Sequence, residues 1–242
     1  KAGIMSGRAE IGPFREKSGY RTESISGEAK VGRGRTIVEN LRIKDPWSDL
    51  SLPLFMMSYA NVKAFQNFIE EVKIDAEIAE SSLDFKTLTY FAPQLGDNKL
   101  KAGVSGKASG YVNDFSLTDM KIASYAGGFS GVVNGRMTGI PDIGSTKIDA
   151  RIDRFNLTGE GLGLFLSEWM QEGELDLSRY ARGHTFMVDA KAEGLLDELD
   201  IDADITSLIG RASADVIIDG LIDKDKPIGI KGTASTDNLD LG

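Results

Sequence analysis

The sequence contains no cysteine and only one histidine in 242 residues. The lack of cysteine excludes disulfides, and it fits a bacterial cytoplasm and a bacterial envelope equally well. The single histidine, His184, excludes metal sites built from several histidines, and no nucleophile-elbow pattern lies near it for a Ser-His-acid triad. We therefore expect no catalytic residues, no metal site and no cofactor, and we do not expect an enzyme.

Positive charge and long apolar runs are lacking as well. The formal net charge is -9 and no basic cluster offsets it, which argues against nucleic acid as a partner. No apolar run approaches the roughly 20 residues that a membrane-spanning helix needs. The chain begins at Lys1 without an initiating methionine or a signal peptide. We expect an internal segment of a longer protein, with any targeting or anchoring element outside it.

Proline is scarce, with 6 residues, whereas glycine is abundant, with 28, a balance typical of many strands joined by tight turns. Residues 184–220 show this most regularly, because apolar and charged residues alternate there in three successive runs. Side chains of a strand point alternately to opposite faces, so each run predicts a strand with one apolar and one charged face. The apolar positions are Phe186, Val188, Ala190, Ala192 and Gly194, then Leu199, Ile201, Ala203 and Ile205, then Ala212, Ala214, Val216 and Ile218.

The same alternation begins near residue 22 and predicts about eleven or twelve strands in an antiparallel meander. A register shift is expected near Asp119 and Met120, and Pro46 and Pro53 bracket an expected break. Short helices are predicted near 61–71, with Asn61 as N-cap, near 84–93 and near 160–170. We expect an irregular initial segment with edge strands at 1–60 and a continuous antiparallel β-groove at 61–242.

The apolar face of these strands has two explanations. The first is an ordinary protein core, formed when two such sheets pack face to face or when one sheet closes into a barrel. Many of the apolar positions are Gly or Ala, however, whereas a dry core is filled by larger side chains. The second explanation is that the small residues leave space for an acyl chain. An acyl chain of roughly sixteen carbons would gain about 13 kcal/mol by moving from water into that space. The predicted lipid-binding groove residues are Val104, Val133, Ile148, Ile152, Val188, Ile201, Ile205, Val216, Ile218, Ile228 and Ile230.

Four strings resemble one protein family by their order and spacing. They are the string from Leu88 to Leu95 (LTYFAPQL), the string from Val104 to Phe115 (VSGKASGYVNDF), the string from Met137 to Ile143 (MTGIPDI) and the string from Lys231 to Leu239 (KGTASTDNL). Together they are similar to the TamB translocation and assembly module proteins of Bacteroidetes-type bacteria, relatives of AsmA. The resemblance covers most of the chain from about Phe65 onward.

The resemblance implies an all-β fold, an elongated and curved antiparallel sheet folded into an open groove, the β-taco, with a few short covering helices. It also implies a periplasmic protein that bridges the inner and outer membranes through an inner-membrane anchor absent from this segment. The implied function is phospholipid transport between the membranes, outer-membrane protein assembly, or both. The implied partners are phospholipid acyl chains and an outer-membrane protein similar to TamA or BamA.

Other interpretations of the sequence are weaker. Asp200, Asp202 and Asp204 resemble a calcium loop, but Arg211 occupies the position of the bidentate glutamate, so a solvated strand face is favoured. One competing function is a scaffold or chaperone whose strand edges pair with client β-strands without conducting lipid. A secreted adhesin or carbohydrate-binding sandwich is disfavoured by the presence of only two tryptophans and by the small-residue faces.

Overall fold

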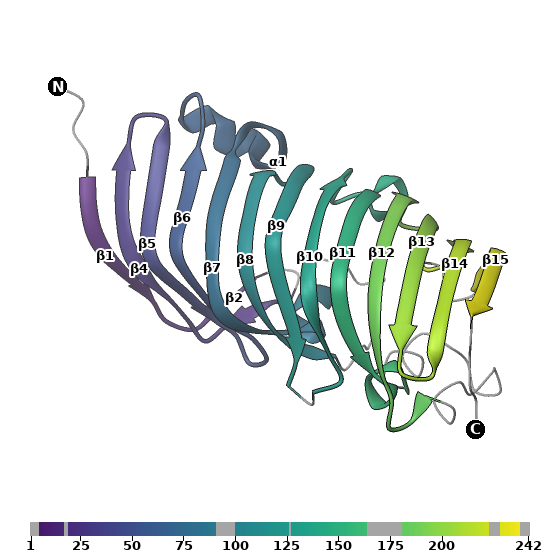
Figure 1. The fold of residues 1–242 in the computed structure, drawn as a ribbon. Coiled ribbons are helices and arrows are strands. Elements are labelled where there is room, and N and C mark those ends of the chain that lie inside the picture. The colour runs from purple at the N-terminus through teal and green to yellow at the C-terminus, as the bar shows by residue number, and fades with distance from the viewer. Residues whose placement is uncertain are drawn as a thin grey trace.

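The structure is a computed structural model that describes residues 5–16, 19–90, 100–125, 127–163, 181–222 and 228–237. Its main feature is one 13-stranded antiparallel sheet, in which the strands follow one another in chain order from β1 at one end to β15 at the other (Figure 1). The strands are β1 (Met5–Ile11), β4 (Ser24–Gly32), β5 (Arg35–Lys44), β6 (Asp49–Ser58), β7 (Lys73–Asp84), β8 (Lys101–Tyr111), β9 (Asp114–Ser124), β10 (Phe129–Thr138), β11 (Lys147–Thr158), β12 (Thr185–Leu195), β13 (Glu198–Ser207), β14 (Gly210–Asp219) and β15 (Gly229–Asp237).

The sheet is open, because β1 and β15 lie at its two ends and do not pair with each other. The strands curve along their length, so that the sheet is bent into a groove rather than lying flat (Figure 1). The predicted all-β, elongated and curved antiparallel fold is therefore confirmed, and a closed barrel is excluded for the strands described.

Residues 184–220 fold as the alternation predicts. In β12 the side chains alternate between exposed and half-buried along the whole strand. Val188 lies opposite Ile205, and Ala190 lies opposite Ala203, so apolar residues face apolar residues across the β12–β13 pair. Directly opposed residues of an antiparallel pair share a face of the sheet, so apolar side chains gather on one face and charged side chains on the other.

Every second strand in the middle of the sheet contains a β-bulge. The pairing register shifts within β5, β7, β9 and β11, which all run in the same direction. Three of these bulges hold a non-glycine residue with positive φ, namely Asn40 at 52°, Asp119 at 49° and Arg154 at 52°. A bulge adds one residue to one strand and bends it. The repeated bulges therefore account for the curvature of the strands. The register shift predicted near Asp119 and Met120 is confirmed, because both pairings of β9 shift there.

The bulge residue Asp119 gives a stability prediction. Its φ lies in the left-handed region, where a β-branched side chain is strained by about 1–2 kcal/mol. We expect Asp119→Val to lower the free energy of unfolding by about that amount, and Asp119→Gly to change it by less than about 0.5 kcal/mol. The hydrogen bond from the Asp119 N–H to Asn134 Oδ1 (2.8 Å) is available to both variants. Urea denaturation measures the difference, and equal stability of the two variants would contradict the prediction.

Strands β1 and β6 are not predicted from the sequence. Pro53 lies inside β6, although proline has no N–H for a sheet ladder. On one side it lies opposite the bulge residue Asn40, between the Leu41–Leu52 and Glu39–Leu54 pairs. On the other side no pairing of β6 with β7 occurs between Asp49 and Leu54. Pro53 is tolerated because neither ladder requires a hydrogen bond from it. As a result, residues 5–58 contribute strands to the same sheet as the rest of the chain.

The short helical segments lie where the strands end. The predicted 61–71 helix is present as η1 (Val62–Asn67) and α1 (Phe68–Glu71), with Asn61 Oδ1 accepting a hydrogen bond from the Lys63 N–H. Phe65 packs edge-on against Tyr59 at 4.8 Å between ring centroids, as expected of a cover on the sheet. Helix α2 spans Phe85–Thr89, within the predicted 84–93.

Residues 159–163 are helical, which covers the start of the predicted 160–170 helix. Residues 91–93 and 164–170 of the predicted helices lie outside the described part of the chain. Within the described part, no helix is both long and apolar enough to cross a bilayer.

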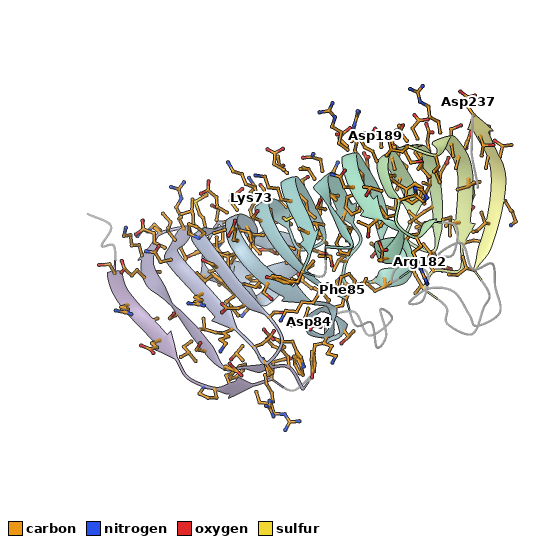
Figure 2. The ribbon with its side chains drawn as sticks, turned by 60° about the horizontal axis from the view of Figure 1, so that its bottom comes forward. Lys73, Asp84, Phe85, Arg182, Asp189 and Asp237 are labelled. Carbon is orange, nitrogen blue, oxygen red and sulfur yellow. The ribbon has the colours of Figure 1, made fainter. Side chains whose placement is uncertain are left out.

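A buried polar network joins α2 to the turn between β5 and β6. The Asp45 side chain accepts hydrogen bonds from the N–H groups of Trp47 and Ser48, both at 2.7 Å, and from Thr87 Oγ1 at 2.8 Å. Burial raises the pKa of Tyr20 to about 12, and the adjacent Asp45 carboxylate adds to that rise. Figure 2 shows Asp84 and Phe85 at the end of β7, where this strand passes into α2, the helix that contributes Thr87 to the network. The network therefore holds the β5–β6 turn against α2, which follows β7.

Candidate functional site

The face of the sheet that carries the apolar residues, here called the inner face, is continuous across all thirteen strands. One line of directly opposed residues, row A, crosses the whole sheet. Row A consists of Met5, Val31, Thr36, Met57, Ile74, Gly110, Phe115, Met137, Ile148, Gly194, Leu199, Ile218 and Ile230. None of these side chains carries a charge.

Row B lies two residues along each strand from row A and therefore on the same face. It consists of Gly7, Ala29, Val38, Phe55, Ala76, Ala108, Leu117, Gly135, Ala150, Ala192, Ile201, Val216 and Gly232. It is uncharged as well. Because a single slip of one residue would move charged side chains into these rows, the register of every strand pair is set by the apolar pattern.

Two further rows complete the C-terminal half of the inner face. Row C runs through Met120, Val133, Ile152, Ala190, Ala203, Ala214 and Ala234. Row D runs through Phe155, Val188, Ile205, Ala212 and Thr236. From β12 to β15 row C consists of alanine alone. A line of small methyl side chains thus runs along the middle of this half, at right angles to the strands.

The structure brings the predicted groove residues together on this face, with one exception. Row A contains Ile148, Ile218 and Ile230, row B contains Ile201 and Val216, row C contains Val133 and Ile152, and row D contains Val188 and Ile205. Val104 joins them because it pairs with Ile122, which pairs with Gly131 of β10. Ile228 precedes β15 and lies outside its ladder.

The inner face is shielded only in part. Among the inner-face residues of β11 to β15 only Leu199, with 8% of its surface exposed, is buried, and the others are half-buried or exposed. Residues between two packed sheets would be buried on this face. The described residues therefore form one apolar trough rather than the core of a sandwich.

The opposite face, here called the outer face, carries the charged residues. Arg42 binds Asp49 through two hydrogen bonds of 2.9 and 2.6 Å, and Arg136 binds Asp114 in the same way at 2.7 and 2.6 Å. Each arginine holds the pKa of its carboxylate partner below the usual range. These paired charges keep the outer face hydrated. They also disfavour a one-residue slip of the strand register, because such a slip would move charged side chains onto the inner face.

The three aspartates of β13 lie on this outer face. Asp202 is opposite Lys191, and Asp204 is opposite Asp189. Within the described ranges, no group of three or more His, Cys, Asp or Glu side chains is placed to hold a metal ion. The arrangement is that of a solvated strand face.

One cavity was not anticipated from the sequence. It has a volume of about 720 Å³ and lies where β6 and β7 separate, lined mainly by outer-face residues such as Arg42, Ser82 and Lys121 and bordered by Val104. Ser81 inserts into the separation: its hydroxyl oxygen accepts a hydrogen bond from the Ser51 N–H at 2.9 Å, and the hydroxyl donates to the Ala79 carbonyl at 2.8 Å. The cavity arises because bulges in two strands face each other across β6, which strand periodicity does not reveal.

The described residues of the trough make it an apolar contact surface. It offers apolar contact along its length without a charge, a catalytic group or a metal ligand set among the described residues. A surface of this kind is suited to contact with apolar groups. Comparison of the chain with protein-family models, with curated proteins and with solved structures finds no significant match.

Proposed function

We propose that the inner face binds hydrocarbon chains of lipids. The observation that carries this proposal is the absence of charge from rows A to D, together with their incomplete burial. Apolar surface left open to water costs about 25 cal/mol per Å², so an uninterrupted open trough calls for an apolar occupant. Row C adds room for it, because four neighbouring strands contribute only alanine there.

The groove-like fold agrees with the resemblance to the TamB family, and we propose the corresponding role. The protein is an envelope-biogenesis protein of the periplasm that provides a hydrophobic path for phospholipids between the inner and outer membranes. An inner-membrane anchor in a longer chain and an outer-membrane partner similar to TamA or BamA belong to the same proposal. The length of the trough supports it, because the rows run through every strand of the sheet.

Photocrosslinking tests the proposal with a matched pair of variants. Ile217 and Ile218 are neighbours in β14, but Ile218 belongs to row A whereas Ile217 is 39% exposed on the outer face. A photoreactive residue at Ala203 is expected to crosslink to phospholipid. We expect Ile218→Asp, like Ile201→Asp, to reduce that crosslink at least about tenfold, since a charge in the trough opposes hydrocarbon. Ile217→Asp is expected to leave it unchanged.

Two controls make the result interpretable. A photoreactive residue at Asp202, one position along β13 on the outer face, should give no lipid adduct. Circular dichroism must show that the three aspartate variants keep the wild-type β-structure. Equal crosslinking of the Ile217→Asp and Ile218→Asp variants would refute lipid binding on the inner face.

A second candidate function rests on the edges of the sheet. Every residue of β1, and every residue of β15 after Gly229, is exposed, and an edge strand presents unpaired backbone donors and acceptors. Such an edge can add a strand of an unfolded outer-membrane protein to the sheet. Crosslinks from β15 to an unfolded barrel protein, without lipid adducts from Ala203, would favour this scaffold role over lipid conduction.

A further inference from the structure

The β2–β3 hairpin brings two positive charges together. Strand β2 (Phe14–Arg15) pairs with β3 (Arg21–Thr22) in a two-stranded sheet of its own, and Arg15 lies directly opposite Arg21. Like charges at directly opposed positions repel each other, because the two side chains share a face. Within the described part of the chain, neither arginine side chain forms an ion pair that would offset this repulsion. The hairpin therefore presents an unbalanced pair of cations.

The hairpin is held against the rest of the protein next to these arginines. The Tyr20 hydroxyl donates a hydrogen bond to Asp45 Oδ2 at 3.4 Å, and the Tyr20 ring lies 5.8 Å from the ring of Tyr90, which follows α2. Directly after β3, the Glu23 N–H donates to the Lys44 carbonyl oxygen at 2.7 Å. Figure 1 shows β2 in the lower part of the molecule. These contacts fix the place of the two arginines.

A cavity of about 300 Å³ opens beside the two arginines. Its lining consists of Arg15 and Arg21 together with Pro13, Phe14, Thr22, Glu23 and Pro46. The acidic residue of this lining, Glu23, is already bound to Lys44 Nζ at 3.0 Å. Its charge is therefore balanced by a lysine and is not available to the arginines. The cavity combines two unbalanced cations with the apolar surface of two prolines and a phenylalanine.

We propose that this cavity binds the phosphate group of a phosphate ester between the guanidinium groups of Arg15 and Arg21. A guanidinium presents its N–H donors in a planar fork that matches two oxygens of a phosphate. A phosphate monoester carries a charge of about −1.5 to −2 at pH 7, so it balances both arginines, whereas one carboxylate balances only one. Pro13, Phe14 and Pro46 offer apolar contact to the organic part of the ester.

The cavity is separate from the trough, because neither β2 nor β3 belongs to the 13-stranded sheet. The inference therefore goes beyond the proposed function and does not depend on what the inner face binds. A soluble phosphate ester and the headgroup of a lipid offer the same group to the two arginines. One probe of each kind is needed to tell these sources apart.

Isothermal titration calorimetry of the whole chain with phenyl phosphate tests the site. We expect Arg21→Gln and Arg15→Gln each to raise the dissociation constant at least about tenfold, because each removes one charge and its paired hydrogen bonds. Arg33→Gln is the matched control, since it removes the same charge from an exposed arginine in the β4–β5 turn. An effect of Arg33→Gln as large as that of Arg21→Gln would overturn the proposal.

Thermal unfolding separates a binding role of Arg21 from a structural one. Without phosphate, Arg21→Gln removes a like-charge repulsion and is expected to leave the Tm equal to that of the wild type or higher. Phenyl phosphate is expected to raise the Tm of the wild type but not that of the variant, because a ligand stabilises the state that binds it. A lower Tm of the variant without phosphate, and an equal rise for both proteins with it, would contradict the proposed site.

Vesicle flotation identifies the source of the phosphate. The two preparations are phosphatidylcholine vesicles with and without phosphatidic acid, a lipid whose headgroup is a phosphate monoester. Retention on phosphatidic acid that is lost in Arg21→Gln assigns the site to a lipid headgroup, whereas calorimetric binding without such retention assigns it to a soluble ester. If neither probe binds in a manner that depends on the arginines, the proposal is overturned. Lipid crosslinking at Ala203 tests the trough separately.

Discussion

Replacing Asp45 by alanine is expected to lower the free energy of unfolding by about 3–5 kcal/mol. Only 4% of Asp45 is exposed, and its carboxylate satisfies the N–H groups of Trp47 and Ser48 and the hydroxyl of Thr87. Each buried donor that loses a charged acceptor costs about 1–3 kcal/mol. The loss is large because the network joins the β5–β6 turn to α2, which lie 42 residues apart in the chain.

Asp45→Asn is the control for charge. The asparagine side chain keeps one oxygen that can accept the Trp47 and Ser48 N–H groups, so we expect a smaller loss of about 1–2 kcal/mol. Equilibrium unfolding in urea gives both values, and hydrogen exchange of the Trp47 and Ser48 amides locates the effect. A change of less than about 1 kcal/mol for the alanine variant would show that the network contributes little to stability.

The strands that sequence periodicity predicted well are those whose two faces differ at most positions. In β12 to β14 the contrast between apolar and charged positions is local, so it can be read without knowing the partners of each strand. Strand β6 is not evident from the sequence because Pro53 has no N–H for a ladder. The facing bulge at Asn40 and the interrupted pairing with β7 make the proline acceptable. Leu83 lies at the end of β7, which extends to Asp84. Asp84 marks that boundary as the N-cap of α2, because its Oδ1 accepts a hydrogen bond from the Lys86 N–H at 2.9 Å.

The inner face was predictable residue by residue, but its continuity was not. The alternation placed Ile201 and Val216 on apolar faces, and only the register shows that they are directly opposed members of one row. The bulges matter here, since a strand with an unrecognised extra residue appears to exchange its faces halfway. The outer-face cavity at Ser81 depends on the same bulges and could not be predicted from any single strand.

The structure also permits a test of whether the trough binds by fit or by general apolar character. Filling row C by Ala190→Phe, Ala203→Phe and Ala214→Phe adds apolar surface but removes space. These residues lie opposite one another on three adjacent strands, so the three rings would fill the floor of the trough over those strands. If the inner face bound ligands through its apolar character alone, the variant would bind a fluorescent long-chain fatty acid more tightly than the wild type. We expect at least about tenfold weaker binding instead.

That magnitude follows from the cost of leaving hydrocarbon in water. Each excluded methylene costs about 0.8 kcal/mol, so excluding about two of them already exceeds the 1.4 kcal/mol that corresponds to a tenfold change. The matched control is Ser213→Phe, one residue from Ala214 on the outer face, which adds a ring without entering the trough. Fluorescence titration compares the three proteins. Tighter binding by the triple phenylalanine variant would contradict a trough that accommodates its ligand between the walls formed by rows B and D.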